Sequence, residues 1–221
     1  MTRQITISLL LLALLAACQE APRADKAKVG EIQAVKPAHG NAYQADTVLS
    51  VIGWIGTKPT GKHHGTLKLV SGVIYVEDTT ITSARFVVDM NTMANVDLAA
   101  DTAMKNKLER ELKSPLFFDV SEYPTAIFEM TAITPYIPSL DDDITLRDAT
   151  HTIEGNFTAK GITKNISFPA KIKISDKKVT ALASFNIDRT LWGMNYRTNK
   201  SLQDKLIKSQ VNISFSVVAV R

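Results

Sequence analysis

The chain has 221 residues and is 45% hydrophobic, 22% charged and 7% aromatic, with a net charge of +4, which is an ordinary composition for a soluble globular protein. Its basic residues are dispersed along the chain, and a dispersed charge of this size argues against a nucleic-acid partner. About two hundred residues are typical of one all-β domain or of two small domains.

The first 17 residues are predicted to be a lipoprotein signal peptide. Arg3 is followed by an almost purely apolar run over residues 5–15, which has the length of a signal sequence and is too short to span a bilayer. The run ends in Leu15-Ala16-Ala17-Cys18, which resembles a bacterial lipobox, where the cysteine is acylated and becomes the first residue after cleavage. An ordinary signal peptide that happens to end at a cysteine is the alternative. Cys18 is the only cysteine of the chain, so an intramolecular disulfide is excluded.

The lipobox resemblance implies lipidation at Cys18 and a lipid-anchored protein of the bacterial cell envelope. Gln19 follows the cysteine, where an Asp often means retention at the inner membrane, so we expect the outer membrane, facing the periplasm. Residues 18–42 lack hydrophobic periodicity and contain Pro22 and Pro37 among charged residues. We expect this segment to be a flexible tether with little packed structure, which holds the folded domain away from the membrane.

The composition changes at Tyr43, where the folded domain, residues 43–221, is expected to begin. Apolar runs and alternating patterns predict strands, and clusters of Gly, Pro and Asp predict the turns between them. Ser71-Gly72 is interpreted as one such turn. The expected strands cover residues 48–55, 66–70, 73–76, 81–90, 125–133, 144–157, 162–174, 179–187 and 211–220.

A β-hairpin is most clearly predicted over residues 153–174. Apolar side chains alternate with polar ones on both sides of Lys160-Gly161, which places one set on a dry face and the other in water. Gly161 supplies the positive φ that a tight reversal needs. Pro169 lies on the polar face and cannot donate to a ladder, so we expect it at an edge or a bulge.

One substantial helix is predicted after Asp101, which is a suitable N-cap. Met104, Leu108 and Leu112 recur every four residues and form an apolar stripe. Ser114-Pro115 should end the helix, because the residue before a proline avoids the helical region. A short second helix is expected near residues 201–207.

About eight mostly antiparallel strands and one helix restrict the architecture to two forms. A two-sheet sandwich and a closed barrel both fit this pattern. A barrel of about eight strands is wide enough to hold one small ligand, although the periodicity does not say whether the interior is hollow.

Three stretches, taken together, carry a recognisable family pattern. The first, residues 112–128, contains Phe117-Phe118-Asp119, then Tyr123-Pro124 and Phe128. The second is Gly155-Asn-Phe-Thr-Ala-Lys-Gly-Ile-Thr-Lys164, and the third is Phe185-Asn-Ile-Asp-Arg-Thr-Leu-Trp-Gly-Met194. In residue types, order and spacing these stretches resemble the YceI-like family, with Phe157 where a Leu is commoner. The resemblance covers residues 43–220.

The resemblance implies an all-β fold, namely an eight-stranded antiparallel, lipocalin-like barrel with one packed α-helix. It also implies a long apolar tunnel that takes a polyprenyl chain or a similar lipid. We therefore expect an apolar lipid or isoprenoid ligand, with a quinone-like molecule included, and no cofactor. The oligomeric state stays open.

Candidate ligand-binding residues are the apolar side chains that the strand patterns place on inward faces, although a filled core would explain each of them equally well. They are Trp54, Phe128, Met130, Phe157, Phe168, Ile172, Ala183, Phe185, Trp192, Met194 and Phe215. Residues 188–194 are expected to leave their strand and cross one barrel end, with Trp192 and Met194 turned inward. His64 and Arg189 are candidate contacts for a ligand head group. The plainer alternatives are a backbone-bonded histidine and, for Arg189, a structural ion pair or a hydrogen bond to loop carbonyls.

The sequence contains no pattern that indicates catalysis. It has no Gly-x-Ser-x-Gly elbow, no His-x-x-x-His or Cys-x-x-Cys pair and no phosphate-binding glycine loop. Three consecutive aspartates at residues 141–143 are interpreted as an acidic solvated loop rather than a metal site. We expect a binding protein and not an enzyme. The alternatives are a structural or interaction lipoprotein with a filled core and, less favoured, an enzyme that acts on a lipid.

Overall fold

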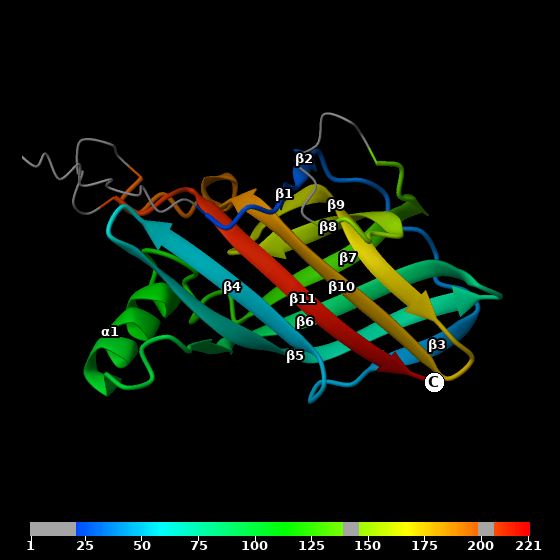
Figure 1. Cartoon of the computed structure of the whole chain (residues 1–221), viewed down its shortest axis with the longest axis horizontal. Helices are drawn as coiled ribbons and strands as arrows, with labels where there is room; N and C mark the ends of the chain where they lie inside the picture. The colour runs from blue at the N-terminus through cyan, green and yellow to red at the C-terminus, as the bar shows by residue number, and fades with distance from the viewer. Residues whose placement is uncertain (1–20, 139–145, 199–205) are drawn as a thin grey trace, which may run out of the picture.

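In the computed structural model, which describes residues 21–138, 146–198 and 206–221, the described strands form one sheet that closes on itself (Figure 1). The strands are β1 (Asp25–Lys26), β2 (Lys28–Gly30), β3 (Asn41–Ala45), β4 (Val51–Lys58), β5 (Gly61–Glu77), β6 (Thr80–Asn95), β7 (Thr125–Pro135), β8 (His151–Ala159), β9 (Ile162–Ile174), β10 (Lys178–Asp188) and β11 (Gln210–Val220). The helices are α1 (Thr102–Lys113) and a short 3-10 helix, η1 (Arg189–Trp192).

The barrel wall has eight strand positions, in the order β10, β11, β3 with β4, β5, β6, β7, β8 and β9. The strands β3 and β4 share one position, because both pair antiparallel with β11 and with β5, towards opposite ends. Between them Asp46 Oδ1 accepts hydrogen bonds from the backbone N–H groups of Val48 and Leu49, each at 2.9 Å. Antiparallel pairing of β9 with β10 closes the ring. The predicted eight-stranded, lipocalin-like barrel is confirmed, and the sandwich is excluded.

The predicted hairpin forms between β8 and β9, paired from His151 with Ala170 to Ala159 with Ile162. Lys160 and Gly161 have φ values of 46° and 72°, as a tight two-residue turn of a hairpin requires. On its other side β9 pairs with β2 at residues 165–167 and with β10 at residues 171–174. Pro169 falls between these two stretches, at an unpaired part of the edge, where its missing N–H costs nothing.

The strand β5 is continuous where the sequence predicted two strands and a turn. It passes through Ser71-Gly72 without reversing, and its ladder with β6 shifts register between Leu69 and Ser71. A Cβ on Gly72 would lie 2.4 Å from the Phe86 ring. The glycine therefore makes room for an aromatic side chain on the neighbouring strand, and the expected turn at this position is wrong.

The helix α1 has the predicted boundaries. Asp101 Oδ1 accepts a hydrogen bond from the Met104 backbone N–H at 2.9 Å, and Ser114 caps the end before the proline. Leu108 and Leu112 pack against the barrel, whereas Met104 is half exposed. The helix is thus attached to the barrel by a narrow apolar stripe. In the described parts of the chain no helix has the length and hydrophobicity needed to cross a membrane. The second helix expected near residues 201–207 lies mostly outside the described residues.

The segment before the barrel domain is not a free tether along its length, which corrects the expectation for residues 18–42. β1 pairs parallel with β10, and β2 pairs antiparallel with β9. Ala27 and Val29 pack against the core, while Lys26 and Lys28, which alternate with them, are exposed. The expectation failed because this alternation spans too few residues to stand out. The segment is ordered because it satisfies backbone groups on the edges of two barrel strands.

We predict that Asp101→Ala lowers the free energy of unfolding by about 1 kcal/mol, because the first turn of α1 loses a backbone hydrogen-bond acceptor. Asp101→Asn keeps an acceptor in the same place and should leave stability nearly unchanged. Urea unfolding followed by circular dichroism measures both. An equal loss in the two variants would show that the carboxylate acts through its charge and not as a cap.

Candidate functional site

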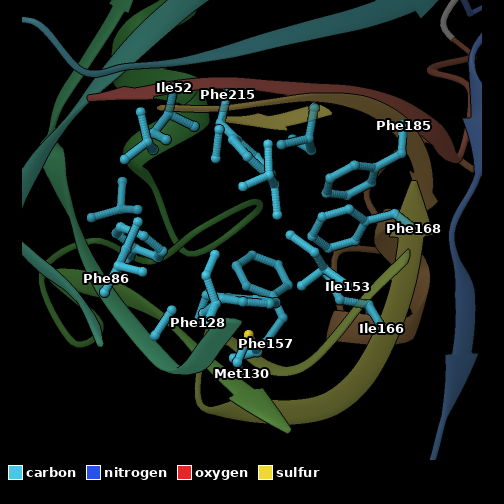
Figure 2. Close-up of a pocket in the computed structure, with 18 of the residues that line it drawn as sticks. Ile52, Phe86, Phe128, Met130, Ile153, Phe157, Ile166, Phe168, Phe185 and Phe215 are labelled. Carbon is cyan, nitrogen blue, oxygen red and sulfur yellow. The ribbon is translucent and has the colours of Figure 1, made fainter. Parts of the chain in front are cut away.

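A cavity of about 110 Å³ lies inside the barrel, and no polar atom faces it. Its wall takes side chains from every strand from β4 to β11 (Figure 2). The lining residues are Ile52, Ile74, Ile81, Ala84, Phe86, Val88, Phe128, Met130, Ile153, Phe157, Ile166, Phe168, Ile172, Ala181, Phe185, Ile187, Ile213, Phe215 and Val217. Such a space excludes charged groups and stays available to an apolar guest.

The wall follows from strand alternation. On β10, Ala181, Phe185 and Ile187 face inward, and their cross-strand partners on β11 include Val217 and Ile213, because side chains two residues apart share a face. Gly155 on β8 also shapes the wall, because it leaves room for the Phe128 ring. A Cβ there would lie 2.2 Å from the ring of Phe128, so only a glycine lets that ring lie flat against the neighbouring strand.

Phenylalanine rings narrow the cavity on one side. Phe168 stacks on Phe185 with centroids 4.1 Å apart, and Phe215 and Phe128 lie 5.7 Å and 5.9 Å from Phe168. Figure 2 shows these rings pointing into the interior. The free volume is somewhat smaller than the ~150 Å³ of an engineered cavity that takes up benzene. The interior is therefore apolar but largely filled, and a long chain can enter only if the rings move.

Seven of the eleven predicted binding residues line this cavity, and the other four do not. The lining seven are Phe128, Met130, Phe157, Phe168, Ile172, Phe185 and Phe215, and the remaining four are Trp54, Ala183, Trp192 and Met194. Ala183 is buried opposite Phe215, but it is Ala181, one inward position earlier on β10, that faces the free space. Alternation predicts which side chains of a strand point inward, but not where along the strand the cavity lies.

Trp192 and Met194 close one end of the barrel. The segment after β10 turns through η1 and Gly193, whose φ is 73°. Trp192 is fully buried, its ring lies 5.4 Å from that of Phe157, and its Nε1 donates to the Phe157 carbonyl at 3.2 Å. Met194 is buried as well. Phe157 lines the cavity and Trp192 does not, so the tryptophan supports the wall from behind.

Arg189 has a structural role, and the predicted head-group contact is not what its geometry provides. Its guanidinium is buried and donates to the backbone carbonyls of Lys208 (3.2 Å), Met194, Tyr196 (2.9 Å) and Ile207 (3.0 Å). Burial lowers its pKa, against the opposing effect of the Asp188 charge. These bonds fasten the end of β10 to the segments that follow it, at a place that does not face the cavity.

His64 also lies away from the cavity, in a polar cluster on the barrel surface. Asp97 is the centre of this cluster: Oδ1 accepts from the His64 backbone N–H at 2.7 Å, Oδ2 lies 2.8 Å from His63 Nδ1, and Asn95 Nδ2 donates to Oδ1 at 2.6 Å. The His64 side chain is 47% exposed. Within the described ranges, no group of His, Cys, Asp or Glu is arranged to hold a metal ion. The cluster binds β5 to the segment before α1.

The Asp97 carboxylate has a perturbed acidity. Burial by itself raises its pKa, but hydrogen bonds from the His64 backbone, His63 and Asn95 outweigh this, and the pKa falls to about 2. The ionised carboxylate is therefore one of the groups that stabilise the folded state near neutral pH.

Trp54 stands beside the cavity, and its polar atom lacks a partner. It is the cross-strand neighbour of Ile213, which lines the cavity, and its ring packs where a Cβ on Gly65 would lie, 2.6 Å from Cζ2. Its buried Nε1 finds no acceptor among the described residues. Leaving a buried N–H unpaired costs about 1–3 kcal/mol.

The sequence reasoning missed most of the aliphatic wall, because it weighted aromatic residues. Twelve further residues line the cavity: Ile52, Ile74, Ile81, Ala84, Phe86, Val88, Ile153, Ile166, Ala181, Ile187, Ile213 and Val217. The signal that could have found them is the same period of two that predicted the strands, because each lies on an inward face.

Comparison with known proteins agrees with this architecture. A family model described as the YceI-like domain matches residues 43–219. The chain belongs to the YceI-like family. No curated protein matches it.

Two solved structures resemble this YceI-like protein over most of its length. BcnA of Burkholderia cenocepacia is 19% identical, with a TM-score of 0.61, covering 79% of this chain and 99% of BcnA. A domain from Saccharophagus degradans, described as a polyisoprenoid binding domain, is 14% identical, with a TM-score of 0.57, covering 80% of this chain and 97% of that domain. At these identities the similarity establishes the fold and nothing finer.

We predict that Asp97 makes the stability of the folded state depend on acidic pH. Its folded pKa of about 2 lies below the ordinary 3.8, so its contribution is complete above about pH 4 and is lost as the pH falls towards 2. Asp97→Asn should be less stable than the wild type at pH 5, and the gap should shrink with falling pH in chemical unfolding. Glu122→Gln, at an exposed carboxylate, is the matched control. A gap that stays constant from pH 5 to pH 2 would contradict this role.

Proposed function

We propose that this protein binds and carries or sequesters the apolar chain of a lipid, an isoprenoid above all, inside its barrel. One observation carries the proposal: a closed barrel encloses a cavity whose whole lining is apolar. The isoprenoid class is suggested by the Saccharophagus degradans relative, which has the same fold and is described as polyisoprenoid binding. A quinone-like molecule, which also carries an isoprenoid chain, belongs to the same class.

The apolar lining can supply the binding energy without a polar anchor. Each CH₂ group moved from water into the cavity contributes about 0.8 kcal/mol, so one five-carbon unit contributes roughly 4 kcal/mol before the costs of association. Met130 and the phenylalanine rings are the wall residues that can rearrange around a longer chain. This agrees with the positions of His64 and Arg189, neither of which faces the cavity.

We propose binding rather than catalysis because no titratable side chain lines the cavity, and general acid–base chemistry requires such a group within hydrogen-bond reach of the substrate. The competing proposal is a structural or interaction protein with a filled core. The small free volume of the cavity is the observation that favours it. Uptake of an isoprenoid separates the two.

We further propose that Cys18 is acylated and anchors the protein in the bacterial cell envelope, on the outer membrane and facing the periplasm. The support is the signal sequence that ends in Leu15-Ala16-Ala17-Cys18. Because β1 is paired with the barrel from Asp25, only seven residue steps separate it from Cys18, and they span at most about 25 Å. The anchored barrel would therefore lie close to the membrane.

We predict that Ala181→Phe abolishes isoprenoid binding while the barrel still folds. Ala181 is buried and lines the cavity, so a ring placed there takes up the free volume, at a cost of about 1–3 kcal/mol in stability. The measurement is native mass spectrometry after incubation with all-trans-farnesol, and the affinity should fall at least tenfold. Leu182→Phe, at the neighbouring exposed position, is the matched control and should bind as the wild type does.

Circular dichroism must show that both variants are folded. Equal retention of farnesol by folded Ala181→Phe and by Leu182→Phe would remove the cavity from the binding site. No retention by any of the three proteins would favour the filled-core alternative.

We also predict that Cys18→Ser releases the protein from the membrane fraction, because the variant cannot be acylated and the apolar run before it is too short to anchor the chain alone. Cell fractionation followed by immunoblotting measures the distribution. Serine differs from cysteine only in the side-chain atom that would carry the acyl group, so the variant tests the thiol directly. Unaltered membrane association of Cys18→Ser would refute the lipid anchor.

A further inference from the structure

The barrel wall has a seam between β9 and β10. These strands pair with each other at only four positions, from Ile174 with Val179 to Lys171 with Leu182. Beyond them, residues 162–170 of β9 and 183–188 of β10 have no ladder in common, and we call this stretch the seam. Its edges pair instead with β2, at residues 165–167, and with β1, at residues 185–186. The N-terminal segment, residues 22–33, which we call the strap, thus covers the seam from outside (Figure 1).

The inner side of the seam is closed by two rings. Phe168 of β9 and Phe185 of β10 stack nearly parallel, with centroids 4.1 Å apart and planes at 13°. Both line the cavity. Figure 2 shows the pair in the wall with the N-terminal segment, in blue, running outside it. At this place only one stacked pair and one strap separate the cavity from the surroundings.

Buried asparagines hold the two ends of the strap. Asn186 Nδ2 donates to the Pro22 carbonyl at 3.0 Å, and the Ala27 N–H donates to the Asn186 carbonyl at 3.0 Å. At the other end, Asn156 Oδ1 accepts from the Gln33 N–H at 3.0 Å and its Nδ2 donates to the Gln33 carbonyl at 2.7 Å. A second asparagine donates to each of these amides. The Asn156 and Asn186 amides thus connect the strap to the outer face of the barrel.

The strap can be detached more easily than any barrel strand. Its apolar contribution to the core is Ala27 and Val29 alone, and its polar attachments include hydrogen bonds that contribute about 0.5–1.5 kcal/mol each. Segments with few buried apolar contacts open at low free energy. No β9–β10 ladder has to break along the seam, because none exists there.

The two ends of the barrel are harder routes. At one end Trp192 is fully buried behind Phe157. At the other, the Tyr43 hydroxyl donates to the carbonyls of Ser175 and Asp176 in the β9–β10 turn, at 3.2 Å and 3.3 Å. At each end the aromatic residue is held by a side-chain hydrogen bond as well as by burial, whereas Phe168 and Phe185 at the seam are held by packing alone.

We propose that the seam is the entry route of the ligand and that the strap is its gate. Release of the strap from β9 and β10 lets Phe168 and Phe185 part, so that an apolar chain enters sideways. This inference rests on the proposed isoprenoid binding, and it adds where the ligand passes and which segment controls its passage.

A reversible cross-link tests the gate. In a Cys18→Ser background, Lys28→Cys and Ser167→Cys place two thiols on direct cross-strand partners of β2 and β9, whose Cα spacing of about 4.5–5.5 Å suits a disulfide. We expect the oxidised protein to take up all-trans-farnesol at least tenfold more slowly than the reduced protein, as followed by native mass spectrometry over time. Addition of reductant should restore the rate.

The matched control joins the same strand to its other neighbour. Thr158→Cys and Thr163→Cys, whose parent hydroxyls lie 2.8 Å apart on β8 and β9, fix the hairpin and leave the seam free. Uptake by this control should not depend on oxidation. Equal rates for the oxidised and reduced strap variant, with the disulfide verified by mass, would overturn the gate and leave the binding function standing. No uptake by any form would overturn both.

Discussion

The closure of the sheet between β9 and β10 is the constraint on which the rest of this barrel depends. An eight-stranded sheet that failed to close would expose two edges and one apolar face. Direct pairing closes it over four positions, and the chain completes the closure with β1 and β2. A wall strand can therefore be apolar on its inner face along its whole length, as β10 is from Ala181 to Ile187.

The interior is a compromise between a packed core and a binding site. Leaving 110 Å³ unfilled costs about 2.6 kcal/mol at roughly 24 cal/mol per Å³, and a guest of the right shape recovers that amount. The glycines at positions 72 and 155 allow Phe86 and Phe128 to lie against neighbouring strands. Large rings beside glycines thus line a wall that keeps free space at its centre.

The sequence predicted correctly those elements that are determined by a few neighbouring residues. The β8–β9 hairpin and the limits of α1 depend on Gly161, Asp101 and Pro115, and the structure has them where they were expected. Contacts between residues far apart in the sequence determine the pairing of the strap, the position of the cavity along the strands and the role of Arg189. No pattern within residues 22–33 says that β9 and β10 separate at their far ends, and Ala181 and Ala183 are equivalent until the cavity is located.

The position of the strap between the anchor and the seam gives the proposed gate a consequence for the whole molecule. With the strap bound, Pro22 is hydrogen-bonded to Asn186, so four residue steps, at most about 14 Å, join Cys18 to the barrel. With the strap released, the chain is next held at His39, whose carbonyl accepts a hydrogen bond from Thr82 Oγ1 at 2.6 Å, which is twenty-one steps and up to roughly 75 Å from Cys18. If Cys18 carries a lipid as proposed, the state that opens the cavity is also the state in which the barrel can move away from the membrane. Loading and reach are then controlled by the same few hydrogen bonds, those of Asn156 and Asn186 with the strap.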